Sequence, residues 1–228
     1  APRRCGRLRA ARKGRRPMKL AVVKLGGSTA FGTHLHEWID ALAAARLAIT
    51  IVPGGGPFAD QVRKAQKPIG FSDSAAHAMA ILAMDQFGHA LADLSARFVP
   101  ARTCAEIAEA SAAGRIPVWL PSAMTLGNRA IPESWDITSD SLAAWLAGRL
   151  GGEALLLVKE TANFSAEDDL DSLARRGVVD ACLSAMLPAG IDFHLAGPED
   201  AATARALLAA GKLPGVRIGT PVLARNAG

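Results

Sequence analysis

Short, nearly continuous apolar runs alternate with longer polar–apolar stretches along most of the chain. The clearest apolar runs are Leu20–Leu25, 48–52 and 154–159. Runs of this kind are typical of strands that are buried on both faces of a sheet. Shorter runs predict further strands at 97–99, 117–120, 191–195 and 216–218.

Between these strands, apolar residues recur every three or four positions, which is the spacing of one helical face. In the segment 34–46 they are Leu35, Trp38, Ile39 and Leu42. The same reasoning predicts helices at 58–66, 73–95, 103–113, Ser139–Leu150, 168–176 and 199–210. Alternating strands and helices predict an α/β fold, with a mainly parallel central sheet covered by helices on both faces.

The positive charge of the chain is concentrated at its beginning. Of 26 basic residues, eight lie in residues 1–17 with no acidic residue among them. The rest has 18 basic and 21 acidic residues, a net charge of −3. We interpret 1–17 as a disordered or non-native extension ahead of Met18, and 18–228 as a single domain. No basic patch with interleaved aromatics occurs, and Tyr is absent, so we expect no nucleic-acid partner.

Several classes of protein are disfavoured by what the sequence lacks. No apolar run is long enough to span a bilayer, and no signal peptide follows the basic start. The three cysteines, Cys5, Cys104 and Cys182, form no CxxC pair, and the histidines have no metal-ligand spacing. We therefore expect a cytoplasmic protein with no membrane partner and no metal ligands of its own.

Two glycine-rich turns follow the first two predicted strands. The first is Lys24-Leu25-Gly26-Gly27-Ser28, and the second is Pro53-Gly54-Gly55-Gly56. Glycine permits tight turns and the close approach of phosphate oxygens to backbone N–H groups. Because ligands bind at the carboxyl edge of parallel sheets, the two turns predict two neighbouring phosphate sites, with Lys24 adding positive charge.

A third segment, Trp135-Asp136-Ile137-Thr138-Ser139-Asp140-Ser141, opens the helix predicted at Ser139–Leu150. Thr138 or Ser139 is a suitable N-cap, and Asp140 lies in the first turn, where the helix dipole favours a carboxylate. Capping alone accounts for these residue types, so the segment is informative only together with the two glycine turns.

Together the three segments resemble the amino acid kinase (aspartokinase/uridylate kinase) family, over residues 19 to about 222. The resemblance implies a three-layer αβα fold with about eight strands, MgATP as phosphoryl donor, and a homo-oligomer formed through the helix at 73–95. The segments 53–63, 72–88 and 134–147 look most similar to the branch that phosphorylates aminomethylfuran-methyl phosphate in methanofuran biosynthesis. Its acceptor is a small phosphomonoester and its product a diphosphate.

The resemblance also implies roles for individual residues. Lys24 and Asp140 would be catalytic, the aspartate orienting the lysine or helping to hold magnesium. Lys24, Gly26, Gly27 and Ser28 would bind the ATP phosphates. Gly54, Gly55 and Gly56 would hold the acceptor phosphate; from the residues themselves, we add that Arg63 would steady that phosphate and Trp135 would wall the acceptor pocket.

The chain departs from many relatives in two places. It has Lys159-Glu160-Thr161-Ala162-Asn163-Phe164 where they carry an Asp-Gly nucleotide loop, and the segment 177–182 lacks a second catalytic lysine. Lys159, at the end of a strand, is the nearest replacement for that lysine. Two alternatives therefore stay open: a kinase for another acceptor, such as uridylate or an amino-acid carboxylate, and a non-catalytic nucleotide- or oxyanion-binding protein.

Overall fold

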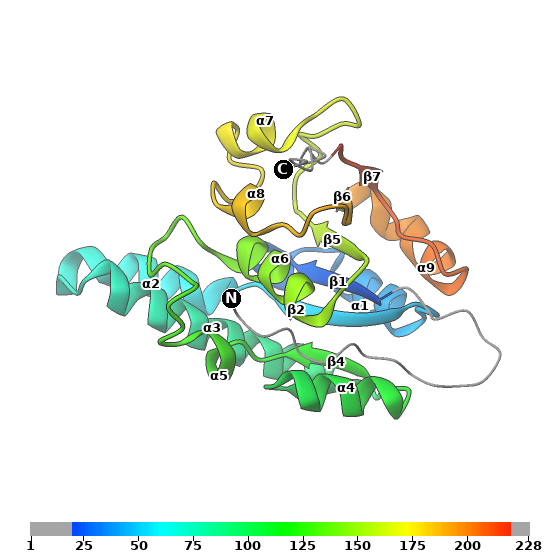
Figure 1. Cartoon of the computed structure of the whole chain (residues 1–228), viewed down its shortest axis with the longest axis horizontal. Helices are drawn as coiled ribbons and strands as arrows, with labels where there is room; N and C mark the ends of the chain where they lie inside the picture. The colour runs from blue at the N-terminus through cyan, green and yellow to red at the C-terminus, as the bar shows by residue number, and fades with distance from the viewer. Residues whose placement is uncertain (1–19, 220–228) are drawn as a thin grey trace, which may run out of the picture.

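The computed structural model describes residues 20–219 (Figure 1). The predictions for residues 1–17, for Met18 and for Cys5 lie outside these residues. In the described part, no helix is both long and apolar enough to cross a membrane.

The centre of the molecule is one seven-stranded sheet. Its strands lie in the order β3-β4-β2-β1-β5-β6-β7, and all neighbours are parallel except β6 and β7. The strands are β1 Leu20–Leu25, β2 Ala48–Pro53, β3 Phe98–Ala101, β4 Ile116–Trp119, β5 Ala154–Val158, β6 Asp192–Ala196 and β7 Val216–Arg217. The predicted α/β fold with a mainly parallel sheet is confirmed, with seven strands in the described residues where about eight were expected.

Every helix predicted from apolar spacing is present, with its ends within a few residues of the expected positions. The helices are α1 Leu35–Ala43, α2 Gly56–Ile69, α3 Asp73–Asp93, α4 Cys104–Ala112, α5 Ser122–Thr125, α6 Ser139–Leu150, α7 Leu170–Arg175, α8 Leu183–Met186 and α9 Ala201–Ala209, with 3-10 turns at Gly27–Phe31 and Pro198–Asp200. Helices α5 and α8 and the turn at Gly27–Phe31 were not predicted, because four or five residues are too few to show a helical period.

Helix α2 is longer than expected because neither of its prolines interrupts it. Pro57 lies in the first turn, where its missing N–H has no helical partner to lose. Pro68 lies in the last turn, and Gly70 then ends the helix in a left-handed conformation, with φ of 83°. Helices α2 and α3 pack side by side and extend beyond the sheet, on the left of Figure 1.

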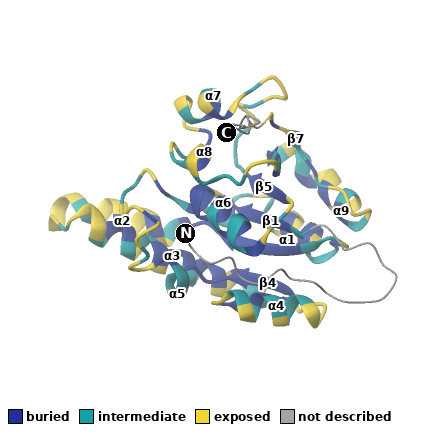
Figure 2. Cartoon of the chain, viewed as in Figure 1, coloured by how far each residue is buried: buried dark blue, intermediate teal, exposed yellow. Residues whose placement is uncertain are grey.

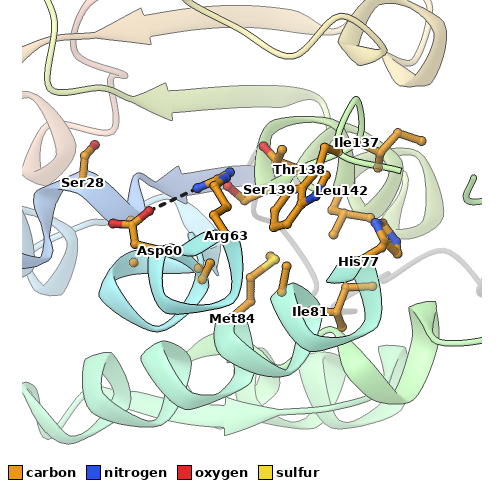
Figure 3. A pocket seen from close by; sticks show the side chains of 16 residues that line it. Ser28, Asp60, Arg63, His77, Ile81, Met84, Ile137, Thr138, Ser139 and Leu142 are labelled. Carbon is orange, nitrogen blue, oxygen red and sulfur yellow. Dashed lines mark hydrogen bonds and ion pairs between the residues drawn. The ribbon is translucent and has the colours of Figure 1, made fainter. Parts of the chain in front are cut away.

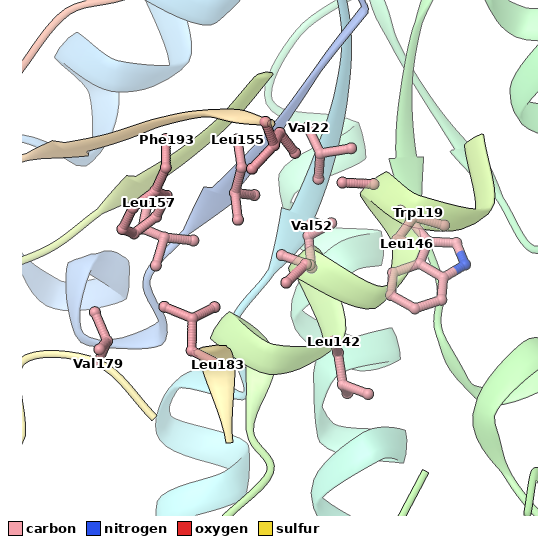
Figure 4. Packing of buried hydrophobic residues seen from close by; sticks show 14 of the residues in the cluster. Val22, Val52, Trp119, Leu142, Leu146, Leu155, Leu157, Val179, Leu183 and Phe193 are labelled. Carbon is pink, nitrogen blue, oxygen red and sulfur yellow. The ribbon is translucent and has the colours of Figure 1, made fainter. Parts of the chain in front are cut away.

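The two faces of the sheet are covered by different helices. Because successive strand residues point to opposite faces, Val22 and Leu157 belong to one buried cluster and Val23 and Leu156 to the other. The first cluster includes the buried face of α6 (Figure 4). The second includes buried residues of α1 and α9, and α3 contributes to both. The central strands β1, β2, β4 and β5 are almost entirely buried between these layers (Figure 2).

Three parallel strands end together at one edge of the sheet. Leu25 at the end of β1 is in register with Pro53 of β2 and with Val158 of β5. The chain therefore leaves β1, β2 and β5 at neighbouring points. β2 and β5 lie on opposite sides of β1. In parallel sheets, ligands usually bind at the carboxyl ends of strands that are arranged in this way.

Candidate active site

Two lysines and one aspartate form a buried cluster at this edge. Lys24 Nζ lies 2.9 Å from Asp140 Oδ1, and Lys159 Nζ pairs with Asp140 Oδ2. Lys24 and Asp140 are 6% and 2% exposed, and the Lys159 side chain is 13% exposed. The three residues named as catalytic from the sequence are thus in direct contact.

The backbone explains why these side chains meet. Lys24 stands two residues after Val22, so its side chain leaves β1 toward the face that α6 covers. Asp140 is in the first turn of α6, and Lys159 directly follows β5, the neighbour of β1. A strand end, a helix start and a second strand end therefore converge on one point.

Opposing effects set the ionisation of Asp140. Burial alone raises the pKa of this carboxyl, but the positive charges of Lys24 and Lys159 together outweigh burial and lower the pKa from 3.8 to about 2. The pKa of Lys159 is lowered, first by burial and then by the charge of Lys24, while Asp140 and Asp180 oppose the shift. Asp140 is therefore ionised at neutral pH and holds two ammonium groups beside each other.

The two glycine turns touch each other directly. A Cβ on Gly27 would lie 2.2 Å from the backbone nitrogen of Gly56, and a Cβ on Gly54 would lie 2.1 Å from the nitrogen of Gly27. Real Cβ atoms do not approach backbone this closely, so only glycine fits at both positions. Gly56 also has a positive φ of 55°, which favours glycine on its own account.

Four N–H groups surround this contact. Within the described part of the chain, no backbone hydrogen bond engages the N–H groups of Gly27, Ser28, Gly55 and Gly56. The last two lie at the start of the 14-residue helix α2, whose dipole favours an anion. Gly54 differs from its neighbours, because its N–H donates to the Leu25 carbonyl oxygen at 2.9 Å and continues the sheet.

A pocket of about 260 Å³ opens beside the glycine turns (Figure 3). Its walls include Gly27 and Ser28 after β1, Gly55 and Gly56 at the start of α2, and the start of α6. The remaining lining comes from α2, α3 and the segment before α6: Ala59, Asp60, Arg63, His77, Ala80, Ile81, Met84, Trp135, Ile137, Thr138, Ser139 and Leu142. Of the residues expected to bind the acceptor, Gly55, Gly56, Arg63 and Trp135 line this pocket, and Gly54 does not.

Arg63 and Trp135 are in contact in the pocket. The guanidinium carbon of Arg63 lies 4.6 Å from the centre of the Trp135 ring, and Nη1 lies 3.1 Å from Asp60 Oδ1. The indole Nε1 of Trp135 donates to Gln66 Oε1 at 2.9 Å. Asp60 and Gln66 were not identified from the sequence, although Asp60 stands three residues before Arg63, a spacing that places both on one helical face.

Asp180 is a site residue that sequence reasoning missed. Thr138 is at the N-cap position of α6 as predicted, but its side chain makes no capping bond within the helix. Instead Asp180 accepts hydrogen bonds from Thr138 N at 2.8 Å, Thr138 Oγ1 at 2.7 Å and Ser141 N at 3.0 Å. Asp180 therefore fixes the turn that carries Asp140. It lies about 40 residues further along the chain, so no local sequence pattern indicates this contact.

The segment 159–164, which replaces the Asp-Gly nucleotide loop, has its own internal bonds. Asn163 N donates to Thr161 Oγ1 at 3.1 Å, and Phe164 N donates to the Ala162 carbonyl oxygen at 2.8 Å. Residues 20–219 contain no group of three or more His, Cys, Asp or Glu side chains that could hold a metal ion.

The buried lysines, the touching glycine turns and the residues that line the pocket all lie within the part of the chain that matches a protein-family model. The model of the amino acid kinase family matches residues 19–175. The chain belongs to the amino acid kinase family. The family assignment supports a phosphotransferase, and the resemblance that the motifs carried is confirmed.

One curated relative in this family is 30% identical over 142 residues, the [5-(aminomethyl)furan-3-yl]methyl phosphate kinase of Methanocaldococcus jannaschii. The match covers 61% of this chain and 65% of the relative. Among solved structures, UMP kinase from Bacillus anthracis covers 90% of the chain at a TM-score of 0.64 and 16% identity. Uridylate kinase from Archaeoglobus fulgidus covers 89% at 0.59 and 16% identity. These structures share the fold of this family member.

Proposed function

We propose that this kinase transfers the γ-phosphoryl group of ATP to the phosphate of a small phosphomonoester and forms a diphosphate. The proposed acceptor is [5-(aminomethyl)furan-3-yl]methyl phosphate, the compound in the name of the curated relative. The observation that carries the proposal is the Lys24–Asp140–Lys159 cluster at the end of the touching glycine turns. We also propose a cytoplasmic location, because the reaction consumes ATP.

The geometry suits two phosphates placed side by side. Lys24, Gly26, Gly27 and Ser28 would bind the phosphates of MgATP, and the start of α2 would bind the acceptor phosphate. In the reaction an acceptor oxygen forms a bond to the γ-phosphorus while the bond from that phosphorus to the β–γ bridging oxygen breaks, releasing ADP. The two ammonium groups would neutralise charge on the transferring oxygens, which is the main task of a kinase site.

The ionisation of Asp140 favours an acceptor that is already an anion. With a pKa of about 2, Asp140 is a weak base and serves to hold the lysines. A phosphomonoester loses its second proton near pH 6 and therefore needs no base at neutral pH. Lys159 would supply the positive charge that relatives obtain from a second lysine in the segment corresponding to 177–182.

The decisive experiment is an assay of MgATP with the proposed acceptor, in which ³¹P NMR detects the diphosphate and a coupled assay detects ADP. We expect Lys24→Ala and Lys159→Gln each to lower turnover by roughly 10²–10³-fold, the typical effect of removing one group that stabilises the transition state. Lys64→Ala, an exposed lysine on α2, is the matched control and should retain wild-type turnover.

Three other results would overturn the proposal in different ways. Turnover with uridylate or an amino-acid carboxylate in place of the phosphomonoester would identify another acceptor. Binding of MgATP without any product would support a non-catalytic nucleotide-binding protein, the alternative that the altered 159–164 loop favours. Full turnover in Lys24→Ala would remove the lysine cluster from the mechanism.

We further propose that the chain forms a homo-oligomer through α3, as its family resemblance implies. Met79 and Leu82, in the middle of this helix, are 41% and 45% exposed. A second copy of α3 would cover these side chains.

A further inference from the structure

One end of the pocket already holds a positive charge between a carboxylate and an aromatic ring. The Arg63 guanidinium lies 4.6 Å from the centre of the Trp135 ring, and its Nη1 lies 3.1 Å from Asp60 Oδ1. Figure 3 shows the pair between Arg63 and Asp60 as a dashed line, and both side chains come from α2 at the pocket wall. A cation beside a carboxylate and over an indole face is the arrangement by which proteins bind ammonium ligands.

The aromatic side of this arrangement is fixed independently of Arg63. Trp135 Nε1 donates to Gln66 Oε1 at 2.9 Å, and Gln66 Nε2 donates to Asp73 Oδ1 at 2.7 Å. This chain of bonds ties the indole to α2 and to the start of α3. The Trp135 ring would therefore keep its place if Arg63 moved.

Arg63 is the movable member. Its side chain is 52% exposed and that of Asp60 is 60% exposed, and exposed ion pairs of this spacing are weak. A phosphate dianion at the glycine end of the same pocket would form a bidentate pair with the guanidinium, which is stronger than the exposed pair with Asp60. Arrival of a phosphorylated acceptor would thus draw Arg63 away from Asp60 and leave the carboxylate and the ring without a cation.

We infer that Asp60 and Trp135 form a site for a primary ammonium group of the acceptor, which Arg63 fills when no acceptor is bound. This inference rests on the proposed function and assigns the residues that would recognise the amine of its acceptor. The three parts of the proposed acceptor then each have a partner: Arg63 and the start of α2 for the phosphate, Trp135 for the furan ring, and Asp60 for the ammonium. Uridylate has no cation for Asp60.

The test compares two acceptors in three proteins. The first acceptor is [5-(aminomethyl)furan-3-yl]methyl phosphate, and the second carries a hydroxymethyl group in place of the aminomethyl group. Wild type should prefer the amine in kcat/KM by roughly tenfold, the ratio that one modest charge interaction supplies. Asp60→Asn should remove most of this preference through KM, leaving kcat/KM for the alcohol within about twofold.

Two further variants separate the roles. Arg63→Gln should weaken both acceptors by the same factor, because both carry the phosphate. Glu37→Gln, which removes an exposed carboxylate on α1 outside the pocket, should change neither. Calorimetric binding of the two acceptors to wild type and Asp60→Asn gives the same comparison without turnover.

An equal amine-to-alcohol ratio in wild type and Asp60→Asn, by both kinetics and binding, would overturn the inference and leave the proposed function intact. Failure of both compounds to yield a diphosphate would instead overturn the proposed function. In that case, loss of the amine preference in Asp60→Asn by calorimetry would still support the ammonium site, and an unchanged preference would reject it.

Discussion

Lys24 Nζ lies 2.9 Å from Asp140 Oδ1 in the buried interior of the molecule, and Lys159 pairs with the other oxygen of the same carboxylate. One negative charge thus holds two positive charges that would otherwise repel each other. Both lysine side chains are held by the same carboxylate, so the position of each depends on the first turn of α6, which carries Asp140. Asp140 is therefore expected to govern stability as well as chemistry.

Replacing Asp140 by Asn removes the shared partner of both lysines. Breaking a buried ion pair from one side typically destabilises a protein by several kcal/mol, so we expect a loss of about 3 kcal/mol at neutral pH. Turnover should fall by roughly 10²-fold or more as the ammonium groups separate. Urea unfolding and the diphosphate assay measure the two effects; wild-type stability in Asp140→Asn would show that the cluster is not a stabilising unit.

The lowered pKa of Asp140 predicts how stability responds to acid. The folded-state pKa of about 2 lies below the ordinary value of 3.8, so this stabilisation is complete above about pH 4 and disappears as the pH falls toward 2. A shift of nearly two units corresponds to about 2 kcal/mol. We expect the difference in unfolding free energy between wild type and Asp140→Asn to shrink by that amount between pH 5 and pH 2. A constant difference would mean that the carboxyl titrates normally.

Asp180 provides a test that separates charge from geometry. In Asp180→Asn the amide oxygen can still accept from Thr138 N and Ser141 N, and the amide nitrogen can donate to Thr138 Oγ1, so the start of α6 should keep its form. The charge near Lys159 is lost. Lys24, Asp140 and Asp180 are the charged groups that act on Lys159, and Asp180 acts to raise its pKa.

We therefore expect Asp180→Asn to shift the alkaline limb of kcat/KM to lower pH, since Lys159 would lose its proton more readily. Stability should change little in Asp180→Asn and fall by about 1 kcal/mol or more in Asp180→Ala, which removes the cap. The pH profile and urea unfolding of both variants are the measurements. An unmoved alkaline limb in Asp180→Asn would assign that limb to a group other than Lys159.

Local patterns predicted the elements that position the site. The bounds of β1 and α6 were predicted to the residue, because β1 is a solid run before two glycines and α6 lies between a Thr-Ser start and Gly151. The helix predicted at 58–66 is shorter than α2, which also includes Pro57 near its start and Pro68 near its end. The helix continues through both prolines because they stand in its first and last turns, where a helix tolerates proline.

The site was predictable wherever its chemistry follows a strand end. Lys24, Gly27 and Gly56 could be identified from the sequence because a lysine and glycines stand where the first two predicted strands end. Asp180 and the Trp135–Gln66 bond join segments far apart in the chain, and single-sequence patterns carry no information on such contacts. Gly54 shows a further limit: it belongs to the glycine motif, but its N–H donates to the Leu25 carbonyl oxygen and continues the sheet, which the motif alone does not indicate.

The contact between the glycine turns predicts the effect of a single methyl group. In Gly27→Ala the new Cβ would lie 2.2 Å from Gly56 N, so the two turns must separate. We expect a loss of about 1–3 kcal/mol in unfolding free energy, as for other overpacked sites, together with a large loss of kcat/KM. Gly148→Ala within α6 is the control, because its Cβ would meet Pro188 Cγ at 3.4 Å and alanine favours helix. Full activity in Gly27→Ala would show that the close approach is not needed.

The exposed apolar residues of α3 predict an oligomer that charge would disrupt. Met79 and Leu82 are 41% and 45% exposed, and a second copy of the helix would bury them. We expect Met79→Glu/Leu82→Glu to convert the assembly to a smaller species in analytical ultracentrifugation, because two buried like charges per copy would face each other. Glu109→Gln on α4 is an exposed charge change away from α3 and should leave the mass unchanged. A monomeric wild-type protein, or an oligomer that survives both glutamates, would rule out this helix as the interface.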